Sequence, residues 1–444
     1  MNSPPPSTAP TSVPLAAAPA SARLLLALIC LAFLILGMAQ AGVGPTLPDL
    51  ARQTNSSTVE AGGALSAWFA GALIGFPVAG LLLRRFAHLR VLCLGWTAFA
   101  LGLAGMVFSP SLVWMLVAAW VLGLGAGTLV LAGNLLAAQA APGAGALNLV
   151  NAIYGVGAIA SPALVGLALT QLGTGLPALR LVCGVALLGL LVALVVLARA
   201  SYAGGLPPRP VALPASAPGH ASEALPARPA HPLDMLRSRL LWACCAFFFT
   251  YVAVEVSLGG WLTILLERAT GMSMAAGAAV MSWFWVLLTA VRFLAAWAGR
   301  HVTTRQTLRC GTGLCVAGGT LLVLSAALHS PLLGIAGASL FGLGLGPIMP
   351  TLTALMQQAF GRDAGWAAGV AMSTGSLGAA LVPWLVGAAV VHLGALPGAA
   401  ILLFMPLGMV VSLALVERCL HQHPQAHAAA ILRPSGQQAG ASLT

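Results

Sequence analysis

Long apolar segments, separated by short polar ones, follow one another along most of the chain. Each apolar segment is close to the ~20 residues that a helix needs to cross a bilayer. Backbone groups in lipid must form their hydrogen bonds within the segment, which favours helices. We therefore predict twelve transmembrane helices, at residues 22–47, 61–83, 91–109, 112–139, 146–171, 177–199, 240–266, 274–298, 308–328, 332–358, 365–390 and 395–416.

A proline-rich segment at 200–239 divides these helices into six and six. Eight prolines exclude a membrane helix there. The sequence thus predicts an all-α membrane protein with twelve transmembrane helices in two pseudo-symmetric six-helix bundles. The bundles are expected at 22–199 and 240–416, joined by a cytoplasmic linker at 200–239. We expect cytoplasmic tails at 1–21, which reads as disordered, and at 417–444.

Two pairs of short motifs repeat between the halves. GAIASPALVG at 157–166 aligns with GAALVPWLVG at 378–387, and GLGAG at 123–127 aligns with GLGLG at 342–346. Each pair falls in corresponding helices of the two halves, at offsets of 221 and 219 residues. This pattern resembles the parallel repeat of major facilitator transporters.

Composition and charge agree with a membrane protein and give its expected orientation. Hydrophobic residues make up 59% of the chain and charged residues 6%, with a mean hydropathy of +0.98. Every basic residue is arginine, and the net charge is +11. With the N-terminus inside, fifteen arginines fall on the cytoplasmic side and three outside. The charge therefore reflects topology rather than nucleic-acid binding, and we expect a multi-pass plasma (bacterial inner) membrane protein with both termini cytoplasmic.

The polar residues show no pattern typical of an enzyme. The eight cysteines fall in or near apolar segments without zinc spacing. No nucleophile–base pair, metal cluster or phosphate loop is apparent. We expect no enzymatic activity, no cofactor and no metal.

The segment GLLLRRFAHLRVL at 80–92 resembles the gating loop of the major facilitator superfamily. Gly80, Arg85 and Arg90 match its glycine and basic positions, so we predict that they act in gating. Arg84 stands where the family has an aspartate. The ion pair that this aspartate usually forms with a neighbouring helix therefore lacks its acidic partner here. The alternative is a simple basic cytoplasmic loop.

Several segments are similar to the fucose–galactose–proton symporter family. They are GVGPTLPDLA at 42–51, LNLVNAIYGVGA at 147–158, YVAVEVSLGGWL at 251–262, the pair Arg292–Phe293, and PIMPT at 347–351. The resemblance implies transport of a small solute coupled to a proton or sodium ion. Fucose-permease-like proteins place carboxylates in helices one and four, where this chain has Gly44 and Val130. Their coupling mechanism therefore does not transfer to the first half.

Glu255 is the only carboxylate deep within a predicted span. An ionisable group at that depth is a functional candidate by default. Burial favours the protonated carboxyl and a nearby arginine favours the ionised one, so Glu255 can bind and release a proton. Arg292, about two turns inside helix eight, either reaches back to the interface or faces the cavity. A structural pair that locks helices seven and eight together is the alternative, and direct contact between the two remains open.

Other polar and aromatic residues are candidates to line a central cavity. Amides can bond to sugar hydroxyls and aromatic faces can stack on a sugar ring, whereas interhelical bonds and plain packing are the alternatives. The candidates are Gln40, Asn134, Asn148, Asn151, Tyr154, Tyr251, Trp261, Trp283, Trp285, Gln357 and Gln358.

The favoured function is secondary active transport of a small hydrophilic solute, a sugar foremost, by alternating access with ion coupling. We expect a monomer whose partners are the solute, the coupling ion and the bilayer. A drug or metabolite efflux antiporter is the first alternative, because GAIASPALVG resembles the antiporter pattern G-x-x-x-G-P with Ser161 at the second glycine. A transport-inactive sensor or scaffold, with a partner bound to 200–239, is the second.

Overall fold

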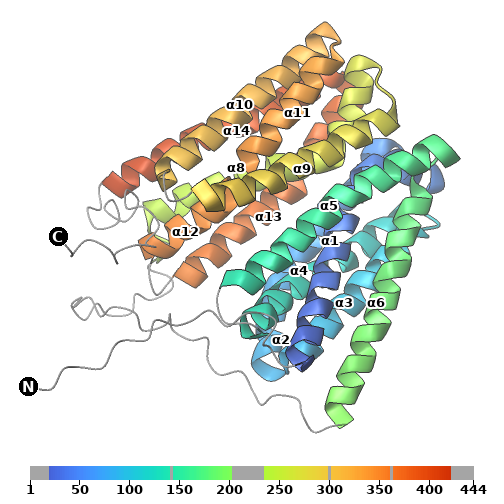
Figure 1. The fold of residues 1–444 in the computed structure, drawn as a ribbon. Helices are drawn as coiled ribbons and strands as arrows, with labels where there is room; N and C mark the ends of the chain where they lie inside the picture. Colours follow the sequence, from blue (N-terminus) through green and yellow to red (C-terminus); the bar gives the residue numbers. More distant parts are fainter. Residues whose placement is uncertain (1–19, 141–143, 203–234, 299–301, 361–363, 422–444) are drawn as a thin grey trace, which may run out of the picture.

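The computed structural model describes residues 20–140, 144–202, 235–298, 302–360 and 364–421. Within these ranges twelve helices are long and apolar enough to cross a membrane, and no strand occurs. Figure 1 shows α1–α6 gathered in one bundle and α8–α14 in another. The predicted tails and most of the predicted linker lie outside the described residues. The helices are α1 (Ala20–Gln53), α2 (Thr58–Arg85), α3 (His88–Val107), α4 (Leu112–Ala140), α5 (Ala144–Leu172), α6 (Leu176–Tyr202), α8 (Arg239–Thr270), α9 (Met274–Ala298), α10 (Thr304–Leu328), α11 (Pro331–Leu345), α12 (Ile348–Phe360), α13 (Ala364–Ala388) and α14 (Ala395–His421).

The tenth span differs from the single helix predicted at 332–358. It consists of α11 and α12, which are separated at Gly346 and Pro347. Proline has no N–H and its ring clashes with the preceding turn, so the helical bonds stop there. The eleventh span also changes, from α13 to a π-helical turn, η3 (Ala389–Leu393). The first helix, by contrast, continues through Pro45 and Pro48.

The internal repeat is visible in how the glycines pack. Gly123 in α4 lies against the backbone of α2, and Gly342 in α11 lies against the backbone of α9. Gly125 faces α3, and Gly344 faces α10 in the same way. A Cβ at any of these positions would meet backbone atoms closer than side chains tolerate. The glycines allow close helix approach, and the two halves therefore use the same packing at matching positions.

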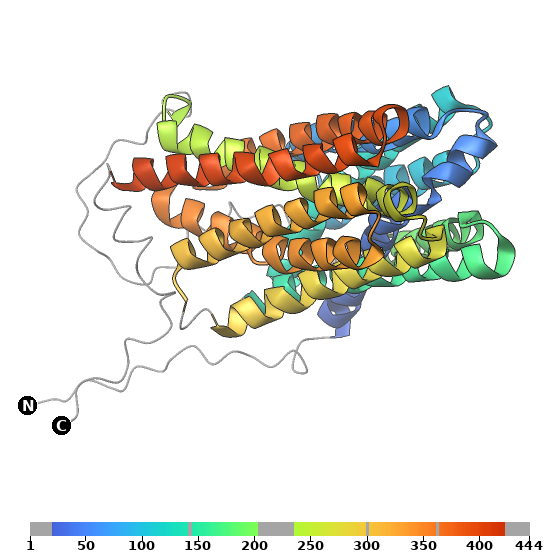
Figure 2. The ribbon, with the colours of Figure 1, turned by 90° about the horizontal axis from the view of Figure 1, so that it is seen from above.

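Figure 2 shows the helices lying side by side along the long direction of the molecule. Because twelve spans alternate in direction, the start of α1 and the end of α14 lie at one face, called here the near face. The opposite face is called the far face. The bundles touch where α1 meets α8, α2 meets α13 and α5 meets α9. A site that serves both bundles must therefore lie along these six helices.

Candidate functional site

The site centres on Glu255 in α8 and Arg292 in α9. Glu255 lies at the middle of its helix, and an Arg292 Nη2 atom lies 4.0 Å from its Oε1 atom. The side chains are 14% and 27% exposed. The structure thus brings together the two ionisable residues that the sequence singled out. This distance is at the limit for an ion pair and too long for a direct hydrogen bond between the two atoms.

Arg292 also contacts the break in the tenth span. Its Nε donates a hydrogen bond of 3.2 Å to the Gly346 carbonyl, between α11 and α12. The guanidinium has five N–H donors in a planar fork. The edge that carries Nε and Nη2 thus bonds to the main chain through Nε and lies nearest Glu255 through Nη2.

Two tyrosines complete the surroundings of this pair. Tyr251 lies one turn before Glu255 on the same face of α8, and its hydroxyl is beside both charges. Tyr154 comes from α5 in the other bundle, and it also lies near both charges. Its ring meets Trp285 of α9 edge to face, with centroids 6.3 Å apart and planes at 78°. The cluster therefore joins the two bundles.

A small enclosed cavity adjoins Glu255 where the bundles meet. It is lined by residues of α1, α2, α8 and α9, namely Gln40, Leu65, Trp68, Phe69, Glu255, Val256, Gly259, Gly260 and Trp285. The space open to the centre of a water-sized sphere is about 10 Å³, roughly what one water molecule needs. A solute can enter only if the helices around it move apart.

Two polar groups of α9 in this region are buried without a hydrogen-bond partner among the described residues. They are the Trp285 indole N–H and the Thr289 hydroxyl, whereas the Tyr251 hydroxyl lies within hydrogen-bonding range of Glu255 and Arg292. Trp285, Thr289 and Arg292 share one face of α9 by their helical spacing. Each unsatisfied buried group costs about 1–3 kcal/mol. A solute with several hydroxyls would supply the missing partners.

The structure distributes the other predicted cavity residues unevenly. Gln40 lines the cavity. Asn134 in α4 has a buried Oδ1 atom without a partner among the described atoms, whereas Asn151 is exposed on α5. Trp283 is 47% exposed and donates to Ser339, so it faces away from the cavity. The side chains of Asn148 and Gln357 lie outside the described residues.

Trp261 does not line this cavity, contrary to the prediction. It is fully buried, six residues beyond Glu255 toward the far face. Its ring fits against Gly62 of α2 and Gly387 of α13, where any Cβ would overlap it. Gly44 of α1 likewise packs directly against the α8 backbone at Gly259. The bundles are therefore in tight contact on the far side of Glu255.

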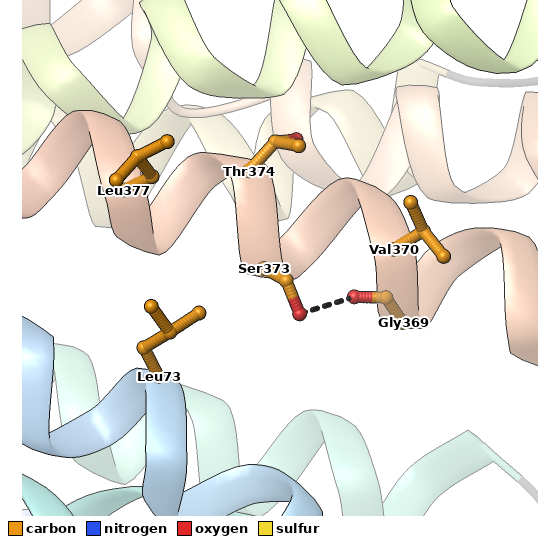
Figure 3. A pocket seen from close by; sticks show the side chains of 6 residues that line it. All are labelled: Leu73, Gly369, Val370, Ser373, Thr374 and Leu377. Atoms are coloured by element: carbon orange, nitrogen blue, oxygen red, sulfur yellow. Dashed lines mark hydrogen bonds between the residues drawn. The ribbon is translucent and has the colours of Figure 1, made fainter.

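Toward the near face, α2 and α13 separate. A hollow of about 490 Å³ lies between Leu73 of α2 and the first half of α13, as Figure 3 shows. The Ser373 and Thr374 hydroxyls beside it already donate within their own helix, to Gly369 and Ala371. This hollow is mostly apolar and offers a polar solute few partners. The hollow shows that the two bundles are separated on the near-face side of the molecule.

The predicted gating segment is mostly helical. Gly80 lies within α2, which continues to Arg85, and only Phe86 and Ala87 separate α2 from α3. Arg85 and Arg90 are exposed at the near face. No atom comes within 4 Å of a Cβ placed at Gly80. A two-residue turn thus replaces the longer loop expected at 80–92.

Sequence reasoning missed Trp68, Phe69 and Thr289. The two aromatic residues looked like ordinary packing in an apolar helix, and nothing in α2 alone marks them. Thr289 had a usable signal, because it lies three residues before Arg292 and four after Trp285. That spacing places all three on one face of a helix.

Twelve membrane-capable helices in two repeated bundles, with an ion pair and a small cavity where the bundles meet, are the architecture of a membrane transporter. The family model described as Major Facilitator Superfamily matches residues 29–383. The chain belongs to the Major Facilitator Superfamily, and it is a multi-pass membrane transporter rather than an enzyme.

One sequence relative and one solved structure are similar to the chain over most of its length. The glucose/mannose transporter GlcP of Bacillus subtilis (strain 168) is 23% identical over 361 residues, which cover 80% of this chain and 85% of GlcP. The crystal structure of a mutant of the nucleoside transporter NupG superposes with a TM-score of 0.67 at 14% identity. That match covers 89% of this chain and 99% of NupG. At this identity, the likeness to NupG concerns the fold alone.

Proposed function

We propose that this transporter moves a small hydrophilic solute, a sugar foremost, by alternating access coupled to a proton or sodium ion. The supporting observation is the Glu255–Arg292 pair beside two buried polar groups of α9 that lack partners among the described residues. A lipophilic substrate would leave Trp285 and Thr289 unsatisfied, and a polyhydroxylated one would not. This favours a polar solute over the drugs of an efflux antiporter.

A sugar fits the chemistry of the cavity. Gln40 offers an amide to hydroxyl groups, and Trp68, Phe69 and Trp285 offer aromatic faces to a sugar ring. The curated relative GlcP is named for glucose and mannose, which supports the same substrate class. The fucose–galactose–proton symporter resemblance agrees with it.

Glu255 is the proposed coupling group. Ionised, it attracts the guanidinium of Arg292; protonated, it loses that attraction and frees Arg292 for a solute oxygen. Proton binding and solute binding would then be linked through one arginine. A sodium ion at the carboxylate would act by the same competition of charges.

Alternating access is supported by the unequal closure of the two faces. Trp261 seals the far side between Gly62 and Gly387, while α2 and α13 part toward the near face. We assign the near face to the cytoplasm, so the structure corresponds to an inward-facing state. The opposite state requires Trp261 to leave this contact.

The test is solute binding and transport by purified protein in liposomes. D-glucose, D-mannose, uridine and a lipophilic cation are compared by thermal stabilisation and by counterflow. The expected result is stabilisation by a hexose, with proton- or sodium-driven uptake lost in Glu255→Gln. Glu267→Gln is the matched control, because Glu267 is an exposed carboxylate on the same helix.

Each rival makes a different prediction in this assay. Stabilisation by the lipophilic cation alone would support an efflux antiporter. Binding without counterflow of any solute would support a sensor or scaffold. Unchanged hexose binding and uptake in Glu255→Gln would remove Glu255 from the mechanism.

A further inference from the structure

The break between α11 and α12 leaves main-chain carbonyls without their helical donors. In an α-helix the carbonyl of residue i accepts from the N–H of residue i+4. The segment PIMP places prolines, which have no N–H, at 347 and 350. The carbonyls of Leu343 and Gly346 therefore cannot receive their usual bonds.

The Gly346 carbonyl receives its bond from Arg292 instead, at 3.2 Å from Nε. The next carbonyl, that of Pro347, is already satisfied by the Thr351 N–H at 3.2 Å and the Thr351 hydroxyl at 2.6 Å. The Arg292 side chain of α9 therefore bonds to the Gly346 carbonyl, which receives no helical bond because Pro350 has no N–H. A main-chain N–H at position 350 would compete for the same oxygen.

Gly346 also brings its carbonyl within reach of α9. A Cβ at this position would lie 2.6 Å from the Leu288 carbonyl and would overlap the Val291 side chain. Only glycine allows this approach. The bond to Nε then fixes the guanidinium with Nη2, on the same edge, 4.0 Å from the Glu255 carboxylate.

We infer that Pro350 is a positioning residue for Arg292: by lacking an N–H, it keeps the Gly346 carbonyl free to fix the guanidinium beside Glu255. This inference rests on the proposed role of the Glu255–Arg292 pair in solute binding. Without the Gly346 bond, the long arginine side chain is free to extend toward the near face. Pro350 thereby couples the tenth span to the solute site through one hydrogen bond.

The first arm of the test measures D-glucose uptake in Pro350→Ala. The substitution supplies the missing N–H, and the Pro350 side chain is exposed, so little packing is lost. A hydrogen bond to a charged group corresponds to about a tenfold change in an equilibrium constant, so we expect KM to rise about tenfold with little change in kcat. Pro347→Ala is the control: it relaxes the same break but supplies an N–H to Leu343 and not to Gly346.

The second arm does not depend on transport. The melting temperature of the purified protein is compared for each proline substitution, alone and in an Arg292→Met background. Pro350→Ala should be more stabilising in the Arg292→Met background, by about 2 °C or more, because there the Gly346 carbonyl has no other donor. Pro347→Ala should have the same effect in both backgrounds. Pro350→Ser supplies the same N–H and repeats both arms if Pro350→Ala is not recovered from membranes.

The outcomes separate this inference from the proposed function. The inference is overturned if Arg292→Met changes the melting-temperature effects of Pro350→Ala and Pro347→Ala equally, even if hexose uptake depends on Glu255. If Arg292→Met changes the melting-temperature effect of Pro350→Ala alone, the inference is supported, even if D-glucose is not a substrate. A rise in KM that is the same for both proline variants also overturns it.

Discussion

At the scale of single residues, two buried tryptophans show how a hydrogen-bond donor can be reserved for a ligand. Trp96 donates its indole N–H to the Ala186 carbonyl at 3.2 Å. Trp285, which is similarly buried, has no acceptor among the described atoms. Buried donors are almost always bonded, and the Trp261 indole N–H on the sealed far side also lacks a partner among the described atoms. Of the two, Trp285 lines the cavity, so its N–H is the one that a solute there can reach.

Replacing Trp96 and Trp285 by phenylalanine should therefore have different effects. Trp285→Phe keeps an aromatic face but removes the unpaired N–H together with part of the buried ring, so stability should fall only by the lost packing, and hexose affinity should fall about tenfold through the lost bond. Trp96→Phe loses the same ring atoms and also its bond to Ala186, so it should lower the free energy of unfolding by about 1 kcal/mol more than Trp285→Phe and leave hexose affinity unchanged. Thermal unfolding and equilibrium binding measure the two effects. Full affinity in Trp285→Phe would exclude its N–H from the solute site.

At the scale of elements, closure of the far side depends on glycines at helix crossings. The Trp261 ring of α8 fits against Gly62 and Gly387 because neither has a Cβ. A side chain at either position would hold α2 or α13 away from α8. The population of the closed state would then fall, because packed interfaces are bistable rather than elastic.

Gly387→Ala should consequently shift the protein toward a state open at the far face and slow hexose uptake at least several-fold. Gly313→Ala in α10 is the control, because nothing lies within 4 Å of its Cβ, and it should be neutral or slightly stabilising by helix propensity, about 0.5–1 kcal/mol. The measurement is the rate at which a thiol reagent labels a cysteine introduced at Leu65, which lines the cavity. An unchanged labelling rate in Gly387→Ala would mean that the Trp261 contact does not control access.

At the scale of the whole molecule, arginine distribution and helix parity together favour one orientation in the membrane. Arg305 and Arg309 at the start of α10 both bond to Glu417 near the end of α14, so several arginines gather at the near face. Arg52, Arg180 and Arg268 lie at the far face. By the positive-inside rule, this distribution supports our proposal that the near face is cytoplasmic.

Labelling of single cysteines in a cysteine-free background should confirm this orientation. A membrane-impermeant maleimide should label Glu267→Cys, exposed at the far face, in intact cells. It should label Arg85→Cys, exposed at the near face, only after permeabilisation. The reverse pattern would invert the assignment and would make the structure an outward-facing state.

The spans, the six-and-six division and the deep carboxylate could be predicted because bilayer thickness imposes length and polarity on every segment. The repeat was predictable as well, since close helix approach requires glycine at matching positions. The break in the tenth span was signalled by Pro347 and Pro350, but its consequence was not. A free carbonyl becomes functional only when a donor from another helix is near it.

By itself, the sequence determined how many helices cross the membrane, how they repeat, which way the arginines direct them and which carboxylate lies at mid-depth, because these follow from local composition and spacing. The tertiary structure alone decided that Arg292 lies within reach of both Glu255 and Gly346. It also decided that Trp285 lines the cavity while Trp261 seals the far side. Periodicity gives the face of a helix on which a side chain lies. Which neighbour that face meets depends on the packing of all twelve helices together.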